Sequence, residues 1–150
     1  MTTVTIRRAT LADLPAVARL FNGYRQFYLQ GSDLALCERF IGERMRNGES
    51  VILLAEDAGG EAVGFTQLYP TFCSVAAQPI FVLYDLFVTP HARKTGAGRA
   101  LMNAARDHAK ASGAARVDLS TARDNFIGQS LYESLGYERD NVYYVYNLTL

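Results

Sequence analysis

The amino-acid sequence predicts a mixed α/β fold in a single domain. Its 150 residues are enough for one domain with a sizeable core and too few for two typical ones. Segments with strand-type patterns alternate with segments at helical spacing along the chain. No repeat, linker or low-complexity stretch divides residues 1–150, so we expect one domain over that range.

The composition is that of an ordinary globular protein. Hydrophobic residues make up 49% of the chain, charged residues make up 20%, and the formal net charge is zero. A neutral chain favours neither nucleic acid nor a membrane surface as a partner. The sequence shows no signal-peptide pattern and no apolar run of about 18 residues. We therefore expect a cytoplasmic protein with reduced thiols.

The first part of the chain is expected to form a short strand and two helices. Residues 4–6 alternate between apolar and polar, as in a strand with one buried face. Thr10 is a suitable N-cap, and Asp13 stands at the capping-box position three residues later. Apolar residues at helical spacing then continue until Gly31, and a second helical pattern covers residues 33–45.

The middle of the chain is expected to form three strands. Residues 50–56 are too few and too β-branched for a useful helix, and residues 57–60 form a turn sequence. Together with residues 61–69, they indicate an antiparallel hairpin. We expect an irregular loop over residues 70–78. Residues 80–88 are nearly all apolar, which is typical of a central strand that is buried on both faces.

The last third is expected to contain two helices and two strands. An alanine-rich helix follows Gly98 and ends at Gly113, and residues 115–120 supply the next strand. Residue 124 or 125 caps a short helix in which large aliphatic residues recur at four-residue intervals. Residues 142–148 alternate unevenly and are expected to form a closing strand.

The loop between the central strand and the alanine-rich helix has the features of an anion site. Pro90 stops the strand, and a glycine-containing turn leads into the helix. Backbone N–H groups at a helix N-terminus lie at the positive end of the helix dipole and suit a phosphate. A cluster of cations indicates that the anion is multiply charged: Arg93, Lys94 and Arg99.

Two common phosphate-binding motifs do not fit this loop. A Walker motif has a lysine after its second glycine, whereas Lys94 precedes Gly96. A dinucleotide-binding motif has glycine or alanine three residues after its second glycine, where Leu101 stands here. What fits is Arg-x-x-Gly-x-Gly after a strand that ends in Val-x-Pro. In this pattern the chain resembles the GNAT superfamily of N-acetyltransferases.

The resemblance implies that the loop binds the pyrophosphate of coenzyme A and that acetyl-CoA is the cosubstrate. Backbone groups of Phe87 and Val88, at the end of the strand, would pair with the pantetheine arm. A backbone N–H group near Val88 would stabilise the oxyanion. Carried over by position, the pyrophosphate is bound by Arg93, Lys94, Thr95, Gly96, Ala97, Gly98 and Arg99.

A second motif lies in the short helix near the end of the chain. Asn125-x-x-Gly128-x-x-x-Tyr132-x-x-x-Gly136-Tyr137 resembles the pattern of the same family. Asn125 and Tyr132 are seven residues apart, so both side chains project from one face of the helix. The resemblance implies that Tyr132 is the general acid that protonates the departing thiolate, although its spacing also fits a packed helix tyrosine. Asn125 fits either an N-cap or a contact to the coenzyme.

The order of the elements also resembles that of the family. It implies a mostly antiparallel central sheet flanked by helices, in which one pair of parallel strands splays apart. The acyl-thiol arm would lie between these two strands, with the strand of Asp85 on one side and the helix of Tyr132 on the other. Family members often form dimers, so a homodimer is an expectation from the resemblance alone.

Asp85 is the only charged residue in the otherwise apolar central strand, where its burial would be costly without a partner. It is either a hydrogen-bonded structural carboxylate or a group that binds the substrate's ammonium or accepts its proton through water. A primary alkylamine has a pKa of about 10.4, so catalysis requires a route for its deprotonation. Five tyrosines could line an acceptor pocket with Asp85 at its base: Tyr24, Tyr28, Tyr69, Tyr143 and Tyr144.

The leading hypothesis is an N-acetyltransferase that transfers acetyl from acetyl-CoA to a primary amine by direct attack in a ternary complex. The acceptor would be a small amine, an amino acid, or a peptide or protein amine. Neither Cys37 nor Cys73 has a histidine partner or metal-site spacing, which argues against a covalent acyl-enzyme and against a metal. One rival is a non-enzymatic acyl-CoA-binding module. Another is transfer to a tRNA-bound or ribosomal amine, which the neutral net charge disfavours.

Overall fold

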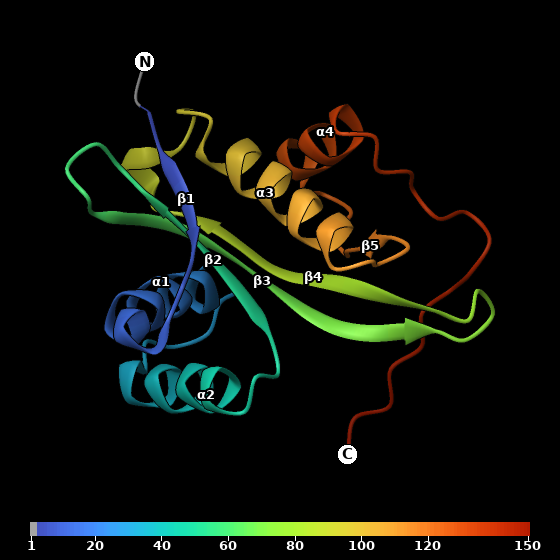
Figure 1. Ribbon diagram of the computed structural model, residues 1–150, viewed down its shortest axis with the longest axis horizontal. Coiled ribbons are helices and arrows are strands. Elements are labelled where there is room, and N and C mark those ends of the chain that lie inside the picture. Colours follow the sequence, from blue (N-terminus) through green and yellow to red (C-terminus); the bar gives the residue numbers. More distant parts are fainter. Residues whose placement is uncertain (1–2) are drawn as a thin grey trace. The chain divides into compact units, whose positions relative to one another are not determined.

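A computed structural model of the chain describes residues 3–150 (Figure 1). These residues form two compact units, one that ends at Leu119 and one from Ser120 to Leu150. The first unit contains the sheet and most of the helices, and the second contains one helix. A single domain over residues 1–150 stays a prediction.

The first unit consists of one five-stranded sheet with helices on both of its faces. Its strands are ordered β1-β2-β3-β4-β5; all neighbours are antiparallel except β4 and β5, which are parallel. Helices α1 and α2 lie on one side of this sheet and α3 lies on the other (Figure 1). The predicted mixed α/β class with a mostly antiparallel sheet is therefore confirmed. The elements are β1 (Thr5–Arg8), α1 (Leu14–Phe27), α2 (Leu34–Arg46), β2 (Val51–Glu56), β3 (Ala62–Cys73), β4 (Gln78–Val88), α3 (Ala97–Ala111) and β5 (Val117–Asp118).

The second helix begins where the sequence predicts, whereas the predicted cap Thr10 caps a 3₁₀ turn over Leu11–Asp13 and α1 itself begins at Leu14. The Thr10 N–H donates to Asp13 Oδ2 at 2.8 Å, as in a capping box, and a single 3₁₀ turn then leads into α1. Asp33 caps α2, because its Oδ1 accepts from the Leu36 N–H at 3.1 Å. Helix α1 ends at Phe27, four residues before Gly31.

Alternating side chains divide the sheet into two packed faces. Phe65 of β3 is fully buried in a cluster formed with α1, α2 and β2, and Phe87 of β4 packs against that cluster. The neighbouring Gly64 belongs to the opposite face. A Cβ added there would lie 2.9 Å from the Phe87 carbonyl oxygen and 3.3 Å from Leu101 of α3. The strands and α3 can therefore approach closely only because residue 64 is glycine.

Helix α3 buries the residues that its periodicity predicts: Leu101, Met102, Ala105 and Ala109. Its start differs from the prediction, because the helix begins at Ala97 and Gly98 lies within its first turn. Gly96 has a φ of 91° and is the N-cap. A left-handed residue at this point is favourable for glycine and strained for other residues, so Gly96 fixes where the helix begins.

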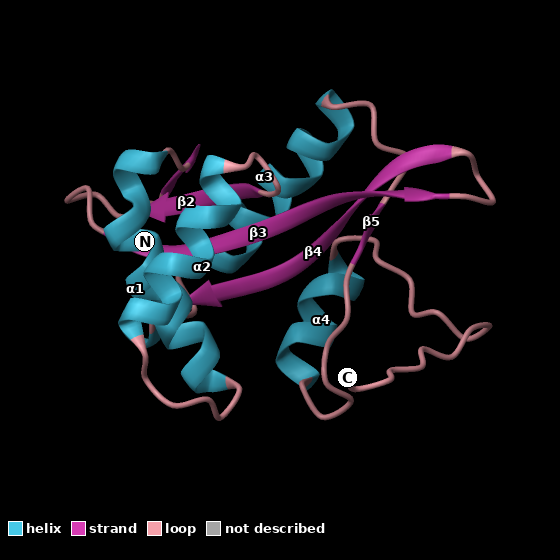
Figure 2. Ribbon diagram, turned by 90° about the horizontal axis from the view of Figure 1, so that it is seen from below, coloured by secondary structure: helices cyan, strands magenta, loops and turns pink. Residues whose placement is uncertain are grey.

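The predicted irregular loop over residues 70–78 is wrong. Strand β3 continues to Cys73 and β4 begins at Gln78, so the two form one long hairpin (Figure 2). Proline usually interrupts a strand because it lacks an N–H group. The last pair between β2 and β3, however, is Val51 with Leu68, so Pro70 lies where β3 has β4 as its one neighbour. An edge position tolerates proline.

The second unit contains α4 (Phe126–Ser134), which Asn125 caps through a bond from the Gly128 N–H at 3.1 Å. The helix ends before Gly136, which has a φ of 93° and provides the expected left-handed turn. The predicted closing strand over residues 142–148 is wrong, since these residues form no regular element. A strand needs a hydrogen-bonded neighbour, and residues 120–150 contain no other strand with which it could pair.

Three properties of the described residues bear on partners. No helix within residues 3–150 is long and apolar enough to cross a membrane. The same residues contain no group of three or more histidine, cysteine, aspartate or glutamate side chains that could hold a metal ion. Cys37 and Cys73 are both free thiols.

Candidate functional site

The loop predicted to bind an anion joins the end of β4 to the start of α3. A single 3₁₀ turn over Pro90–Ala92 leads into it, and Lys94 and Gly96 both have left-handed backbones, with φ of 64° and 91°. The first helical bond runs from the Ala100 N–H to the Gly96 carbonyl at 2.9 Å. The N–H groups of Ala97 and Gly98 therefore have no acceptor within the helix, as is general for the first turn of a helix, where phosphates bind in other proteins.

Arg93 fastens this loop to the end of the strand. Its Nε donates to the Val88 carbonyl at 2.9 Å, and its guanidinium carbon lies 5.6 Å from the centre of the Phe87 ring. The ring of Phe27 lies 6.0 Å from the same carbon. Arg93 therefore holds the loop against the strand as well as supplying a positive charge, and Lys94 and Arg99 are exposed residues of the same loop.

The end of β4 holds a buried hydroxyl that sequence reasoning did not identify. Thr89 Oγ1 is buried and has no hydrogen-bond partner among the described residues. Its own N–H donates to the Val63 carbonyl at 2.8 Å, which fixes the backbone at this point. A threonine before proline has no sequence signal for such a role. A buried hydroxyl without a partner, next to a cationic loop at a helix N-terminus, fits a ligand that carries both amide and phosphate groups, as coenzyme A does.

Asp85 lies on β4 and is 3% exposed. One of its carboxylate oxygens, Oδ2, accepts a hydrogen bond from the Gln67 amide on β3. Gln67 is itself fully buried, and its Oε1 accepts from the Ser50 hydroxyl at 2.7 Å. The Thr66 hydroxyl donates to the Asp85 carbonyl at 2.7 Å. Both the backbone and the side chain of Asp85 are therefore held by β3.

An extra residue in β4 turns two consecutive side chains toward the same space. Leu68 pairs with Leu83 and Gln67 pairs with Asp85, so Tyr84 is inserted between them as a β-bulge. Consecutive residues of a regular strand face opposite sides, yet Tyr84 and Asp85 line one cavity. The Tyr24 hydroxyl donates to the Tyr84 carbonyl at 3.0 Å and so joins the bulge to α1.

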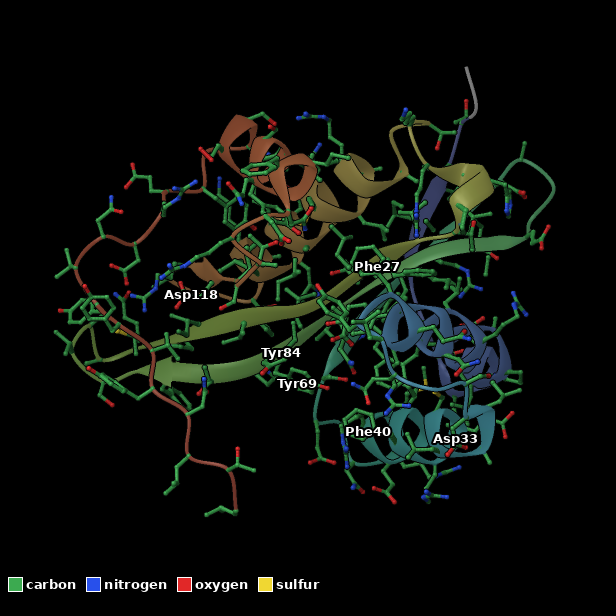
Figure 3. All side chains as sticks on the ribbon, turned by 180° about the vertical axis from the view of Figure 1, so that it is seen from behind. Phe27, Asp33, Phe40, Tyr69, Tyr84 and Asp118 are labelled. Atoms are coloured by element: carbon green, nitrogen blue, oxygen red, sulfur yellow. The ribbon has the colours of Figure 1, made fainter. Side chains whose placement is uncertain are left out.

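The cavity has a volume of about 430 Å³ and its wall is mainly aromatic. Figure 3 shows Tyr69 and Tyr84, whose rings are 5.8 Å apart, on the two neighbouring strands and Phe40 on α2. The prediction of an aromatic pocket that includes Asp85 is confirmed for three of the five tyrosines. Tyr143 and Tyr144 belong to the second unit. The lining residues are Phe21, Tyr24, Arg25, Tyr28, Gln30, Phe40, Tyr69, Tyr84 and Asp85.

Burial controls the protonation of the groups around this cavity. It raises the pKa of Asp85 to about 6, although the hydrogen bonds from Gln67 and Tyr24 act in the opposite direction. Burial and then the nearby Asp85 raise the pKa of Tyr69 to about 12. The same two causes raise the pKa of Tyr24 and Tyr28 above that of an ordinary phenol. At neutral pH Asp85 is therefore mostly ionised, while the phenols of Tyr24, Tyr28 and Tyr69 stay neutral.

The second motif lies entirely in the second unit. Asn125 uses both ends of its amide, because Oδ1 accepts from Gly128 and Nδ2 donates to Thr121 Oγ1 at 2.9 Å. A Cβ on Gly128 would lie 2.6 Å from Asn125 Nδ2, which explains a residue smaller than alanine at this position. Tyr132 is half-buried, and its ring centre lies 6.2 Å from that of Tyr137. Asn125 therefore caps the helix, and its contact to the coenzyme stays a prediction.

Comparisons with known proteins extend over almost the whole chain. Residues 14–137 match the model of the acetyltransferase (GNAT) family. The uncharacterized N-acetyltransferase YhfO of Bacillus subtilis (strain 168) is 50% identical over 147 residues, which cover 98% of each protein. A crystal structure of a probable acetyltransferase is 36% identical, with a TM-score of 0.91 and 97% coverage of both chains.

A more distant crystal structure shares the fold. It is that of the aminoglycoside N-acetyltransferase AAC(6')-Iy in complex with CoA, which is 20% identical with a TM-score of 0.79 and covers 100% of this chain and 97% of that one. The family match and the 50% identity to a relative are similarities of sequence, which a shared fold alone does not require. On these grounds the chain belongs to the acetyltransferase (GNAT) family and is an acyltransferase.

Proposed function

We propose that this enzyme transfers the acetyl group of acetyl-CoA to a primary amine, by direct attack in a ternary complex. The acceptor is a small amine, an amino acid or a peptide amine. The observation that carries this proposal is a buried carboxylate, Asp85, on the wall of an aromatic cavity of about 430 Å³. Aromatic rings beside a carboxylate suit an alkylammonium group.

Asp85 would bind the incoming amine and assist its deprotonation. A primary alkylamine has a pKa of about 10.4 and arrives as an ammonium ion at neutral pH. The pKa of Asp85 is raised to about 6, so the carboxylate is mostly ionised at neutral pH and is a better proton acceptor than an exposed carboxylate. It attracts the ammonium group and then receives the proton through water, which leaves the nitrogen lone pair free to attack.

The loop before α3 would hold the coenzyme. Bound acetyl-CoA supplies the acetyl group in activated form, as a thioester. The N–H groups of Gly96, Ala97 and Gly98 donate to the diphosphate, Thr95 belongs to the same turn, and Arg93, Lys94 and Arg99 balance its charge. Backbone groups of Phe87 and Val88 pair with the pantetheine arm, and an N–H group near Val88 stabilises the oxyanion. Asn125 contributes a coenzyme contact in addition to its cap.

Tyr132 is proposed as the general acid. Its place in the family motif supports this role, because the resemblance implies that the tyrosine of that motif protonates the departing thiolate. A phenol has a pKa of about 10 and a thiol of about 8.5, so proton transfer costs little and depends mainly on positioning.

An assay of thiol release from acetyl-CoA across a panel of amines tests the proposal. We expect release that depends on both acetyl-CoA and an amine, and Asp85→Asn should lower kcat/KM for amines while CoA still binds. Saturable CoA binding without release for any amine would instead support the rival acyl-CoA-binding module. If thiol were released with tRNA or ribosomal protein as the one effective acceptor, the result would support transfer to a tRNA-bound or ribosomal amine.

The cellular location, the partners and the oligomeric state of the enzyme are also proposals. Two free thiols agree with a reducing cytoplasm, where we place the protein. The neutral net charge gives no reason to include nucleic acid or a membrane among its partners. A homodimer is proposed from the family resemblance, and sedimentation velocity would test it.

A further inference from the structure

Arg25 lines the same cavity as Asp85 and has no acidic partner. It lies in the last turn of α1, where its side chain is partly buried. Among residues 3–150, no carboxylate lies within 4.0 Å of its guanidinium. By contrast, Arg44 of α2 pairs with both Glu43 and Glu49. The positive charge of Arg25 is therefore left uncompensated on a pocket wall.

The local structure does not account for this position. A cation in the last turn of a helix is favoured by the helix dipole, but a side chain directed into solvent would serve that purpose equally well. The Arg25 guanidinium also acts on the Cys37 thiol, whose pKa is nevertheless raised because burial outweighs it. A neutral thiol cannot balance a guanidinium charge. The cavity therefore contains a cation that has no acidic partner within residues 3–150.

The same cavity also contains a negative charge, the carboxylate of Asp85, which is not paired with Arg25. Asp85 is bonded to a neutral amide and also lacks a cationic partner among the described residues. Arg25 and Asp85 do not pair with each other, although both line the cavity. The remaining wall is aromatic or amide, with no other charged side chain. One ligand with a positive and a negative end would satisfy both residues at once.

We propose that the acceptor is a primary amine that also carries an anionic group, a carboxylate or a phosphate, and that Arg25 binds this group. The inference rests on the proposed function, in which Asp85 receives the amine. A guanidinium offers paired N–H donors that match the oxygens of either anion. Phe21, Tyr24 and Phe40 contact the carbon skeleton between the two ends. Arg25 is thus a residue that determines specificity and takes no part in the transfer of the acetyl group.

The test compares amines in matched pairs that differ in the anionic group alone. Amino acids are set against their amides and against the amines without the carboxyl group, and aminoalkyl phosphates against aminoalcohols. We expect the anionic member of a pair to have the higher kcat/KM. Arg25→Gln should lower kcat/KM for anionic amines by about 10- to 100-fold, mainly through KM, since hydrogen bonds to charged groups are of that strength. Neutral amines should change less than about twofold.

Two control variants separate recognition from folding. Arg19→Gln removes an exposed arginine from the same helix, outside the cavity, and should leave every amine unaffected. Arg25→Lys keeps the charge and should restore part of the preference for anionic amines. An equal loss for neutral and anionic amines in Arg25→Gln would overturn the proposal and indicate a structural role.

The two proposals fail in distinguishable ways. Efficient transfer to neutral amines with no preference for their anionic partners would overturn the assignment of Arg25 and leave the acetyltransferase proposal intact. An absence of transfer to every amine, with CoA still bound, would overturn both. A preference for phosphates over carboxylates, or the reverse, would identify the anion that Arg25 binds and would support the inference.

Discussion

The carboxyl group of Asp85 is buried at 3% exposure, and the two groups that lower its pKa, the Gln67 amide donor and the Tyr24 hydroxyl donor, are both uncharged. Ionising it in that position costs free energy, because neither donor replaces the water that burial removes. The sequence predicts this residue, since one acid in an apolar strand stands out. It does not predict Gln67 and Ser50, which give no signal until the register places Gln67 opposite Asp85.

Asp85→Asn should stabilise the fold at neutral pH. A carboxyl whose pKa is 3.8 unfolded and about 6 folded makes its full contribution to stability below pH 3.8 and loses it as the pH rises through 6. Two pKa units correspond to about 3 kcal/mol. The free energy of unfolding of Asp85→Asn relative to the native protein should therefore rise by roughly that amount between acid and neutral pH. Urea unfolding at several pH values measures it.

Asp13→Asn supplies a control of opposite sign. Hydrogen bonds from Arg7 lower the pKa of Asp13 to about 2, so its contribution to stability is present above pH 3.8 and lost as the pH falls toward 2. This variant should be less stable than the native protein at neutral pH, and the difference should shrink in acid. If Asp85→Asn followed the same trend, the Asp85 carboxylate would have a compensating partner.

Tyr132→Phe should lower kcat with little change in acetyl-CoA affinity. Removing one general acid reduces turnover by about 100-fold or more, whereas the aromatic ring that packs near Tyr137 is retained. Steady-state kinetics and equilibrium titration with acetyl-CoA measure the two effects. Tyr137→Phe is the matched control and should keep its activity. Unchanged turnover in Tyr132→Phe would remove this tyrosine from the mechanism.

At the scale of elements, the loop before α3 depends on one left-handed glycine. Gly96 has a φ of 91°, and an added Cβ there would contact nothing within 4 Å. Gly96→Ala therefore adds backbone strain alone, of about 1–2 kcal/mol. We expect this strain to turn the amides of the loop and to weaken CoA binding by about 10-fold, as isothermal titration would show.

Gly60→Ala is the control for that prediction. Gly60 lies in the turn between β2 and β3 with a φ of 83° and equal space around it. Its replacement should cost similar stability and leave CoA affinity unchanged. Equal CoA affinity in the two variants would show that the loop before α3 does not bind the coenzyme.

The elements also show where a sequence pattern ceases to be informative. Helix α3 and the hairpin turn at residues 57–60 are predictable because capping, periodicity and turn residues agree. Pro70 misleads because its effect depends on whether β2 extends that far. The bulge at Tyr84 could not be predicted, since a strand that is apolar except for Asp85 has no regular alternation of polar and apolar residues that a bulge would shift. Residues 142–148 have strand-type composition but no neighbouring strand in their unit.

At the scale of the whole molecule, anion binding depends on a local cluster in a neutral protein. The formal net charge is zero, so the long-range attraction to a diphosphate comes from the loop cations, while the loop N–H groups act at short range. Raising the salt from about 0.1 M to 1 M shortens the screening length from about 10 Å to 3 Å and should weaken CoA binding. Binding of pantetheine, which lacks the phosphates, should change little.

CoA should also stabilise the folded protein. A ligand at 100 times its dissociation constant adds about 2.7 kcal/mol to the free energy of unfolding. Thermal unfolding with CoA in low and high salt measures both effects together. A CoA-induced shift in Tm that was independent of salt would contradict a site built from Arg93 and Lys94.

The long hairpin of β3 and β4 has unequal support along its length. Phe65 to Leu68 lie between two strands, whereas residues from Tyr69 to the turn have β4 as their one neighbour, and Phe72 and Val75 near the tip are 77% and 100% exposed. Two-stranded ribbons are marginally stable in water. In deuterated buffer, amide protons near the tip should therefore exchange rapidly through local fraying. Amide protons around Phe65 should exchange slowly, because their exchange requires global unfolding.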